Sequence, residues 1–202
     1  MTNEPVVHII DDDDAVRESL AFLLETADLT VKTYDSAARF LEQALPAEAG
    51  CLITDIRMPG MTGLELVRQL NERGSTLPVI VITGHGDVPL AVEAMRAGVV
   101  DFIEKPFDDD AILAALRRAL DLSRDHAEAV AERKAIAERL AKLSGRERQV
   151  LDGLVAGQAN KVIALNLGIS PRTVEVYRAN LMTKMLASSL SELVRMTLNA
   201  QR

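Results

Sequence analysis

Residues 51–55 have the sequence CLITD, a short apolar and β-branched run that ends in an aspartate. Similar runs recur at Val6–Ile10, Val31–Tyr34, Val79–Thr83 and Phe102–Glu104, and several of them are apolar on both faces. Such strands are typical of a parallel sheet that helices cover on both sides. Amphipathic segments separate the runs and predict helices at about 14–27, 36–44, 63–73, 87–97 and 108–122. We therefore expect a five-stranded parallel doubly wound α/β domain at the start of the chain.

A helical linker is predicted to follow this domain. From Leu120 to Lys142 the chain is rich in Ala, Glu, Arg and Lys and contains no Gly or Pro. This composition favours a solvated helix that extends the last helix of the first domain as a stiff connection. A pairing seam on this helix is an alternative that the spacing leaves open, through Leu116, Leu120, Ala127 and Val130.

Short helices without intervening strands predict a second, all-α domain. Ser144 and Glu147 form a capping box that opens the first helix, Asn160–Leu167 is the second, and Ser170-Pro171 opens the third. A last helix is expected over about 191–199. The small core is expected to contain Leu165, Leu167, Ile169, Val174, Leu181 and Met185. The predicted organisation is thus a first domain at 4–122, a linker at 123–141 and a second domain at 142–202.

Charge is distributed unevenly along the chain, whose net charge is -7. Residues 1–124 carry 11 basic and 22 acidic side chains, a net charge of -11, whereas residues 141–202 carry 9 and 4, a net charge of +5. An acidic front and a basic back indicate two domains with different partners. The first residues lack the pattern of a signal peptide, and no stretch is apolar enough to span a membrane, so a cytoplasmic protein without a membrane partner is expected.

Charged and hydroxyl side chains follow the predicted strands. Asp11 and Asp12 follow the first strand, Asp55 follows the third, and Thr83 and Lys105 close the fourth and fifth. In flavodoxin-like sheets, ligands bind at the carboxyl ends of the strands, where the strand order reverses between strands one and three. Clustered carboxylates favour a cation, and three oxygen ligands with room for a phosphate suit Mg²⁺, with Mn²⁺ as an alternative. Asp55 could then act as a nucleophile on phosphorus.

Structural roles compete with chemical ones at several other positions. Asp13 and Asp14 open the first helix, where a carboxylate often serves only as a cap. His8 lies inside a strand and is expected to be packed, and His85 lies in a Gly-His-Gly loop, where an exposed position is favoured over a chemical role. Cys51 is the only cysteine, and its apolar neighbours favour a buried thiol over a reactive one.

Four strings resemble the receiver domain of two-component response regulators over about residues 4–122: HIIDDDDAVRESL, LITDIRMPGMTGLEL, VIVITGHGD and AGVVDFIEKPF. The resemblance implies that Asp55 is the phosphoacceptor. It also implies that Asp11 and Asp12, together with the backbone carbonyl of Arg57, hold the magnesium ion.

The same resemblance implies how the first domain signals. Thr83 and Phe102 are the implied switch positions, Lys105 the implied contact to the phosphoryl group, and Lys105-Pro106 is expected to be a cis peptide. The output surface is expected on the fourth helix and fifth strand, with an apolar dimer patch of Val88, Val92 and Met95. An unmodified first domain would mask the basic domain, and phosphorylation would release it and permit homodimerisation.

The string IALNLGISPRTVEVYRANLMTKM resembles the LuxR/FixJ-type helix-turn-helix over about residues 140–200. Groove-facing positions implied by the resemblance are Glu175, Val176 and Ala179, of which Glu175 could read a cytosine and Val176 a thymine methyl group. The phosphate-contacting candidates are Lys161, Arg172, Arg178 and Lys184, and Thr173 is added to the DNA-binding set. Tyr177 departs from the family's usual His, which leaves its role open. The layout as a whole resembles regulators of nitrogen fixation of the FixJ type.

The resemblance implies a transcriptional regulator without enzymatic activity, most consistent with an activator. Its implied partners are a sensor histidine kinase, promoter DNA, RNA polymerase and a second copy of the chain. Two other classes compete. A haloacid-dehalogenase-like phosphatase also uses Asp, Thr and Lys with magnesium, but expects an acid two residues after the nucleophile, where this chain has Arg57. A receiver that acts only through protein partners would leave the basic domain without DNA binding.

Overall fold

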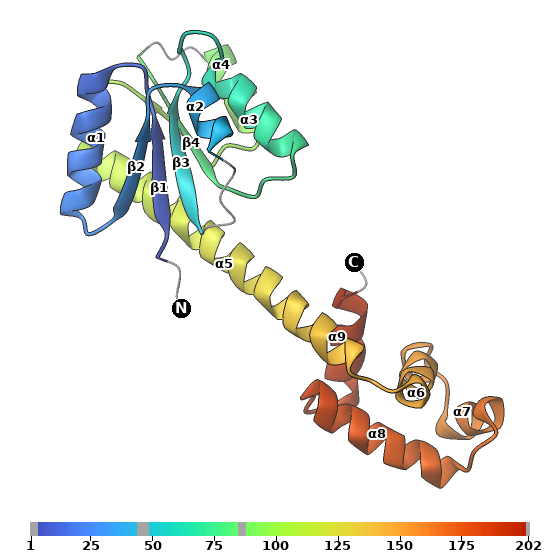
Figure 1. Ribbon diagram of the computed structural model, residues 1–202. Coiled ribbons are helices and arrows are strands. Elements are labelled where there is room, and N and C mark those ends of the chain that lie inside the picture. Colours follow the sequence, from blue (N-terminus) through green and yellow to red (C-terminus); the bar gives the residue numbers. More distant parts are fainter. Residues whose placement is uncertain (1–3, 44–48, 85–87, 201–202) are drawn as a thin grey trace. The chain divides into compact units, whose positions relative to one another are not determined.

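The computed structural model describes residues 4–43, 49–84 and 88–200 (Figure 1). The chain forms two compact units, Met1–Ala127 and Glu128–Arg202. Among the described residues, no helix is both long enough and apolar enough to cross a bilayer.

The first unit is built on one parallel sheet of five strands. The strands are β1 (Val6–Ile10), β2 (Thr30–Tyr34), β3 (Gly50–Asp55), β4 (Val79–Thr83) and β5 (Asp101–Glu104). They lie in the order β2-β1-β3-β4-β5, and every neighbouring pair is parallel. The predicted doubly wound fold is thus confirmed, with the reversal of strand order between β1 and β3 where the acidic site was expected.

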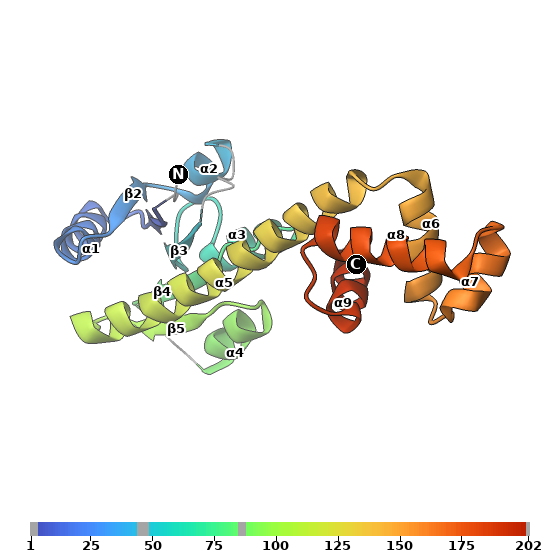
Figure 2. The same cartoon turned by 90° about the horizontal axis from the view of Figure 1, so that it is seen from below.

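Five helices cover the two faces of this sheet (Figures 1 and 2). They are α1 (Asp14–Thr26), α2 (Ala37–Glu42), α3 (Gly63–Glu72), α4 (Val88–Arg96) and α5 (Asp109–Ala141). α1 and α5 pack on one face, where Leu20 and Leu24 meet Ile112 and Leu116 over the side chains of β1, β3 and β4. α2, α3 and α4 pack on the other face. Both faces are apolar because helices bury both, as the strand sequences predicted.

α5 covers the helix predicted at 108–122 together with the helical extension that the composition of the following segment predicted. It continues without a break through the linker segment to Ala141, as a stretch lacking Gly and Pro allows. Ser123 is buried and accepts a hydrogen bond from the backbone N–H of Gly50 at 2.8 Å, which ties this part of α5 to the start of β3. The alternative pairing seam through Leu116, Leu120, Ala127 and Val130 does not form one exposed face, because Leu116 and Leu120 pack into the core of the first unit whereas Ala127 and Val130 are exposed.

The second unit is all helical. After the end of α5 it contains α6 (Gly145–Val155), α7 (Asn160–Leu167), α8 (Pro171–Met185) and α9 (Leu190–Ala200). Ile136 and Leu140, from the segment predicted as a linker, pack with Val174 and Leu181 in its core. Gly168 ends α7 in a left-handed conformation, with φ of 65°, and Ser170 caps the N-terminus of α8, which gives the compact helix-turn-helix geometry that the sequence predicted.

One predicted core position of the second unit is wrong. Leu165 is 82% exposed, whereas Ile163 and Ala164 on the same helix are buried. Residue 165 lies about 200° around the helix axis from residue 163, because each residue turns an α-helix by about 100°. The packed face of α7 is therefore the one that carries Ile163 and the half-buried Leu167, and Leu165 points away from it.

Candidate functional site

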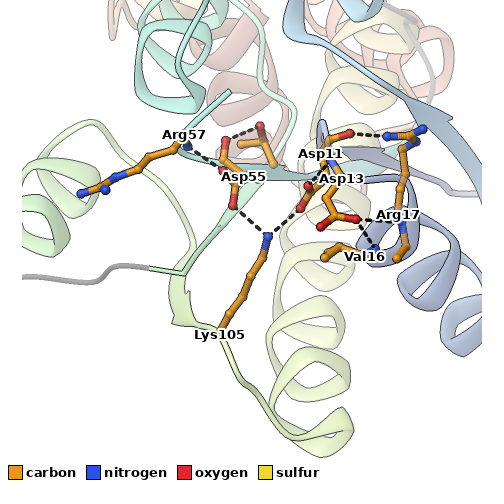
Figure 3. Close-up of polar contacts among 9 residues, drawn as sticks. Asp11, Asp13, Val16, Arg17, Asp55, Arg57 and Lys105 are labelled. Carbon is orange, nitrogen blue, oxygen red and sulfur yellow. Dashed lines mark hydrogen bonds and ion pairs between the residues drawn. The ribbon is translucent and has the colours of Figure 1, made fainter. Parts of the chain in front are cut away.

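The carboxyl edge of the sheet gathers the acidic and basic side chains that the sequence singled out (Figure 3). Asp11 comes directly after β1, Asp55 ends β3, and Lys105 follows β5. Asp11 is 1% and Asp55 5% exposed, so both carboxyl groups are removed from bulk water. The topology places them together because β1 and β3 are neighbours in the sheet.

The ammonium group of Lys105 lies between the two carboxylates. Its Nζ donates to Oδ2 of Asp11 at 2.7 Å and to Oδ1 of Asp55 at 2.9 Å. Its backbone N–H donates to the carbonyl of Thr83 at 2.7 Å, which fixes the start of the loop after β5 against the end of β4. The Lys105-Pro106 peptide is cis, as expected from the resemblance.

The second carboxylate oxygen of Asp55 is held by the loop that follows β3. The backbone N–H of Arg57 donates to Oδ2 of Asp55 at 2.6 Å. The loop returns at Gly63, whose N–H donates to the carbonyl of Ile56 at 2.9 Å. A Cβ atom at Gly63 would lie 2.2 Å from the carbonyl oxygen of Asp55, so this close approach of two backbone segments requires glycine.

Burial and the neighbouring charges shift the pKa values of Asp55 and Lys105 in opposite directions. Burial raises the pKa of the Asp55 carboxyl group, and the hydrogen bonds from Lys105 and the Arg57 amide offset only part of that rise. For Lys105, burial disfavours the charged form, but the hydrogen bonds to Asp11 and Asp55 together outweigh it and raise its pKa. Lys105 is therefore a fixed positive charge beside a carboxylate whose ionisation costs stability.

This cost predicts how stability depends on pH. A carboxyl group whose pKa is raised by folding stabilises fully below its unfolded pKa, and the contribution is lost as pH rises through the folded pKa. We expect the free energy of unfolding of Asp55→Asn to increase relative to that of the wild type as pH rises from about 4, the ordinary pKa of the carboxyl group, to about 7. Denaturant unfolding of both proteins, monitored through hydrogen exchange of β3 amides, measures the difference. A constant difference across this range would contradict the assigned burial effect.

The other aspartates after β1 differ from Asp11. Asp13 is the N-cap of α1, where its carboxylate accepts from the N–H groups of Ala15 at 2.9 Å and Val16 at 3.3 Å. Asp14 pairs with Arg17 on the surface. The capping role is thus confirmed for Asp13. Asp12 is exposed, and its role as a metal ligand stays a prediction.

The donor set at the edge suits a hard divalent cation in its chemistry. Asp11 and Asp55 already turn one oxygen each toward a single cationic group, the Lys105 ammonium, so they can share a positive charge. In the described part of the chain, no three His, Cys, Asp or Glu side chains are arranged as a ready metal cage. The predicted ligand set of Asp11, Asp12 and Asp55 therefore stays a prediction.

Of the two predicted switch residues, Thr83 lies at this edge, whereas Phe102 lies further back on β5, opposite Val81 of β4. Thr83 is buried at the end of β4. Phe102, on β5, is half-buried and packs against the apolar cluster that contains Ala94 of α4. The predicted dimer patch is exposed on α4, with Val88 77%, Val92 43% and Met95 53% accessible. Its apolar side chains are therefore available to a partner.

The predicted DNA-reading residues occupy the exposed side of α8. Glu175, Val176 and Ala179 are exposed, while Val174 and Leu181 point into the core. Tyr177 is half-buried against the same core, which gives this departure from the family's usual His a packing role. Thr173 lies in the first turn of α8, and its N–H and hydroxyl both interact with the Ser170 cap.

The four predicted phosphate-contacting cations fall into two groups. Lys161 and Arg172 are exposed near the N-termini of α7 and α8 and make no side-chain ion pair or hydrogen bond within the described residues. Arg178 donates to Oδ1 of Asn160 at 3.0 Å, and Lys184 donates to Oε2 of Glu147 at 2.8 Å. Sequence reasoning identified the cap role of Glu147 but missed its contact to Lys184, 37 residues away.

Glu147 is 4% exposed and completes the predicted capping box with Ser144. The hydrogen bonds from Lys184 and from Ser144 lower the pKa of Glu147 to about 2. A depressed carboxyl pKa contributes stability that is present above the unfolded pKa and lost as pH falls through the folded one.

We therefore expect the second unit to lose on the order of 2 kcal/mol of stability between about pH 4.5 and pH 2, a loss that Glu147→Gln removes. Unfolding followed by NMR signals of α6 residues in both proteins tests this expectation. Equal pH dependence of the two proteins would show that another group is responsible.

The histidines and the single cysteine had structural expectations from the sequence. His8 is buried in β1, with Nδ1 3.1 Å from the Tyr34 hydroxyl and its ring near Phe40, so it is packed as expected. His85 lies outside the described residues. Cys51 is buried, and burial raises the pKa of its thiol to about 12, which confirms the prediction of an unreactive cysteine.

Comparison with protein families agrees with both units. Residues 7–117 match the response regulator receiver domain, and residues 141–197 match the LuxR family of bacterial regulatory proteins. A receiver domain followed by a LuxR-type helix-turn-helix domain defines a DNA-binding response regulator. The chain belongs to this family of two-component transcription regulators, and the dehalogenase-like phosphatase interpretation loses its support.

Individual relatives match over nearly the whole chain. The transcriptional regulatory protein FixJ of Azorhizobium caulinodans is 62% identical over 194 residues, which cover 96% of this chain and 92% of the relative. The response regulator TodT of Pseudomonas putida is 47% identical over 195 residues, 95% of this chain and 85% of the relative.

Solved structures of the family show the same architecture. The response regulator StyR matches with a TM-score of 0.84 and 42% identity, covering 96% of this chain and 98% of that chain. Full-length FixJ from B. japonicum matches with a TM-score of 0.59 and 50% identity over 99% of this chain and 98% of that one. The chain is thus a FixJ homologue in sequence and in fold.

Proposed function

We propose that this protein is a phosphorylation-dependent activator of transcription that accepts a phosphoryl group on Asp55 from a sensor histidine kinase. The observation that carries the proposal is the triad at the sheet edge, in which Lys105 binds both Asp11 and Asp55. The proposal includes a cytoplasmic location, where promoter DNA is found, and self-modification in place of enzymatic turnover.

Asp55 is the proposed nucleophile. A carboxylate oxygen of Asp55 forms the new bond to phosphorus, and the leaving group departs with the electron pair of the bond that breaks. Asp11, Asp12, Asp55 and the backbone carbonyl of Arg57 would hold Mg²⁺, which when bound neutralises charge on the phosphoryl oxygens. The loop amide of Arg57 keeps the Asp55 carboxylate in place before the reaction.

Lys105 changes partners in this scheme. Before phosphorylation its ammonium compensates two carboxylates. Phosphorylation replaces one negative charge on Asp55 by about 1.5 to 2 on the phosphoryl group, so Lys105 has a stronger partner there than before. The Thr83 hydroxyl can hydrogen-bond the same group, and Phe102 links this end of the sheet to the apolar packing beside α4. These two residues are the proposed reporters of the modification.

The DNA-binding function rests on α8. Its exposed Glu175, Val176 and Ala179 are proposed to face the major groove, and Lys161 and Arg172 to contact phosphates. A single helix reads few base pairs, so binding as a dimer to paired half-sites follows. The exposed Val88, Val92 and Met95 are the proposed dimer patch after phosphorylation.

Regulation is proposed to act by masking. The acidic receiver would hold back the basic second unit, and phosphorylation would release it, permit dimerisation and allow contact with RNA polymerase. The likeness to FixJ in sequence favours control of nitrogen-fixation genes as the pathway. The same layout also occurs in TodT, a regulator with a different name.

The test uses the full-length protein with a small phosphoryl donor and Mg²⁺. Intact mass, sizing and DNA binding are measured on the same samples. We expect a gain of one phosphoryl group together with dimerisation and tighter, salt-sensitive DNA binding. Labelling without any change in DNA binding would instead support a receiver that acts through protein partners. No labelling, where a known receiver is labelled, would overturn the proposal.

A further inference from the structure

Two polar links hold the C-terminal turn of α8, at the far end from the residues proposed to read DNA. Lys184 donates to the buried carboxylate of Glu147 at the start of α6, and the carbonyl of Met185 accepts from Arg139 at the end of α5 at 3.3 Å. Lys184 lies about 18 Å along the helix axis from Arg172, at a rise of about 1.5 Å per residue over twelve residues.

The carboxylate of Glu147 is already engaged before Lys184 is counted. A single oxygen, Oε2, accepts from the backbone N–H of Ser144, from its hydroxyl and from the Lys184 ammonium, each at 2.8 Å. The side chain of Glu147 is 5% exposed, whereas that of Lys184 is 44% exposed. Removing Lys184 would therefore leave a buried carboxylate without its charged partner, which is far more costly than losing a surface charge.

The other basic residues of this surface differ in the partners they have. Lys161 and Arg172 are exposed and make no ion pair within the described residues, so their charges are available to a phosphate. Arg178 donates one hydrogen bond to Asn160, and its guanidinium group has further N–H donors that can contact a phosphate. Lys184 has one ammonium group, and that group is directed at a buried acid.

We infer that Lys184 is a positioning residue of the recognition helix, paired with Glu147, and not a phosphate ligand. This inference rests on the proposed DNA-binding function and assigns its charges: Lys161 and Arg172 bind the DNA backbone, while Lys184 and Glu147 fix the orientation of α8 relative to α6. A phosphate that drew Lys184 away would have to leave Glu147 buried and unpaired.

The two roles predict different salt dependence. Each phosphate contact contributes about 0.9 to the slope of log K against log salt concentration on duplex DNA, because a bound cation releases a counterion. Removing a phosphate ligand therefore lowers the slope, whereas removing a positioning residue lowers affinity at every salt concentration and leaves the slope unchanged. Glu147→Gln separates the roles further, because it frees Lys184 for DNA while it loosens α8.

The experiment measures binding of the full-length, donor-phosphorylated protein to a duplex selected from a random-sequence library for binding to the wild type. Lys184→Met and Arg172→Met remove the same charge from the same helix and form the matched pair. We expect Arg172→Met to reduce the slope by about 0.9. Lys184→Met and Glu147→Gln should each weaken binding about tenfold at every salt concentration, a change of about 1.4 kcal/mol, with an unchanged slope.

The double variant and a conservative variant guard against simple unfolding. Glu147→Gln/Lys184→Met should bind no more weakly than either single variant, because the unpaired buried charge is gone, and Lys184→Arg should restore wild-type affinity. Thermal unfolding of each variant identifies the temperature at which all are folded. A reduced slope for Lys184→Met, or tighter binding by Glu147→Gln, would overturn the inference. If the wild type bound no duplex in a salt-dependent way, the proposed DNA-binding function itself would fail, and the role assigned to Lys184 with it.

Discussion

Asp55→Asn is expected to abolish phosphorylation. The asparagine side chain has nearly the same shape and can still accept a hydrogen bond, but its amide is not a nucleophile toward phosphorus. After incubation with a small phosphoryl donor and Mg²⁺, the intact mass of the variant should stay unchanged while the wild type gains one phosphoryl group. DNA affinity of the treated variant should remain that of the untreated wild type.

Asp13→Asn is the matched control for this prediction. Asp13 is an exposed helix cap close in sequence to the site, and asparagine caps helices as well as aspartate does. The control should therefore be labelled like the wild type. Labelling of Asp55→Asn at the wild-type level would place the phosphoacceptor at another residue and contradict the assignment of the site.

Gly63→Ala is expected to damage the site through its backbone. The new Cβ would meet the carbonyl oxygen of Asp55 at 2.2 Å and its carbonyl carbon at 3.1 Å, so one of two backbone segments must move. Overpacking of this kind costs about 1–3 kcal/mol of stability. Displacement of the nucleophile by about 1 Å costs about 100-fold in reaction rate, and the rate of labelling by a phosphoryl donor measures it.

Gly84→Ala serves as the control for the removal of a glycine. Among the described residues, apart from its chain neighbours, no atom lies within 4 Å of a Cβ atom at Gly84, and its backbone needs no left-handed conformation. Its free energy of unfolding should match that of the wild type. If Gly63→Ala were also as stable as the wild type and labelled at the same rate, the loop after β3 would be able to shift without moving Asp55.

Much of the first unit was predictable because its signals are local. Each strand is a short apolar run, and the parallel arrangement brings residues that end β1, β3, β4 and β5 to one edge. The proximity of Asp11, Asp55 and Lys105 follows from that topology, whereas the bridge that Lys105 forms between the two carboxylates was not predicted. The sequence offered a helix-cap role for both Asp13 and Asp14, and the start of α1 assigns the cap to Asp13.

The second unit shows where sequence patterns are insufficient. Leu165 was expected in the core from its residue type, but the helical face that packs is fixed by α6 and α8, which contact α7 from one side. The pairing of Glu147 with Lys184 joins residues on two helices without a periodic relation. The last turns of α5 contribute Ile136 to this core, although their composition indicated only a solvated linker.

The single buried cysteine, Cys51, allows opening of the receiver core to be measured by thiol alkylation. Cys51 lies in β3, four residues before Asp55. Burial raises the pKa of its thiol to about 12, so the folded protein holds little of the reactive thiolate. Because the side chain is buried, a thiol reagent can reach it only when the centre of the sheet opens. The chain has no other cysteine to compete for the reagent. The rate of alkylation thus measures how often β3, the strand that carries the proposed phosphoacceptor, opens. Comparing this rate before and after phosphorylation gives the change in the stability of that strand without any added label.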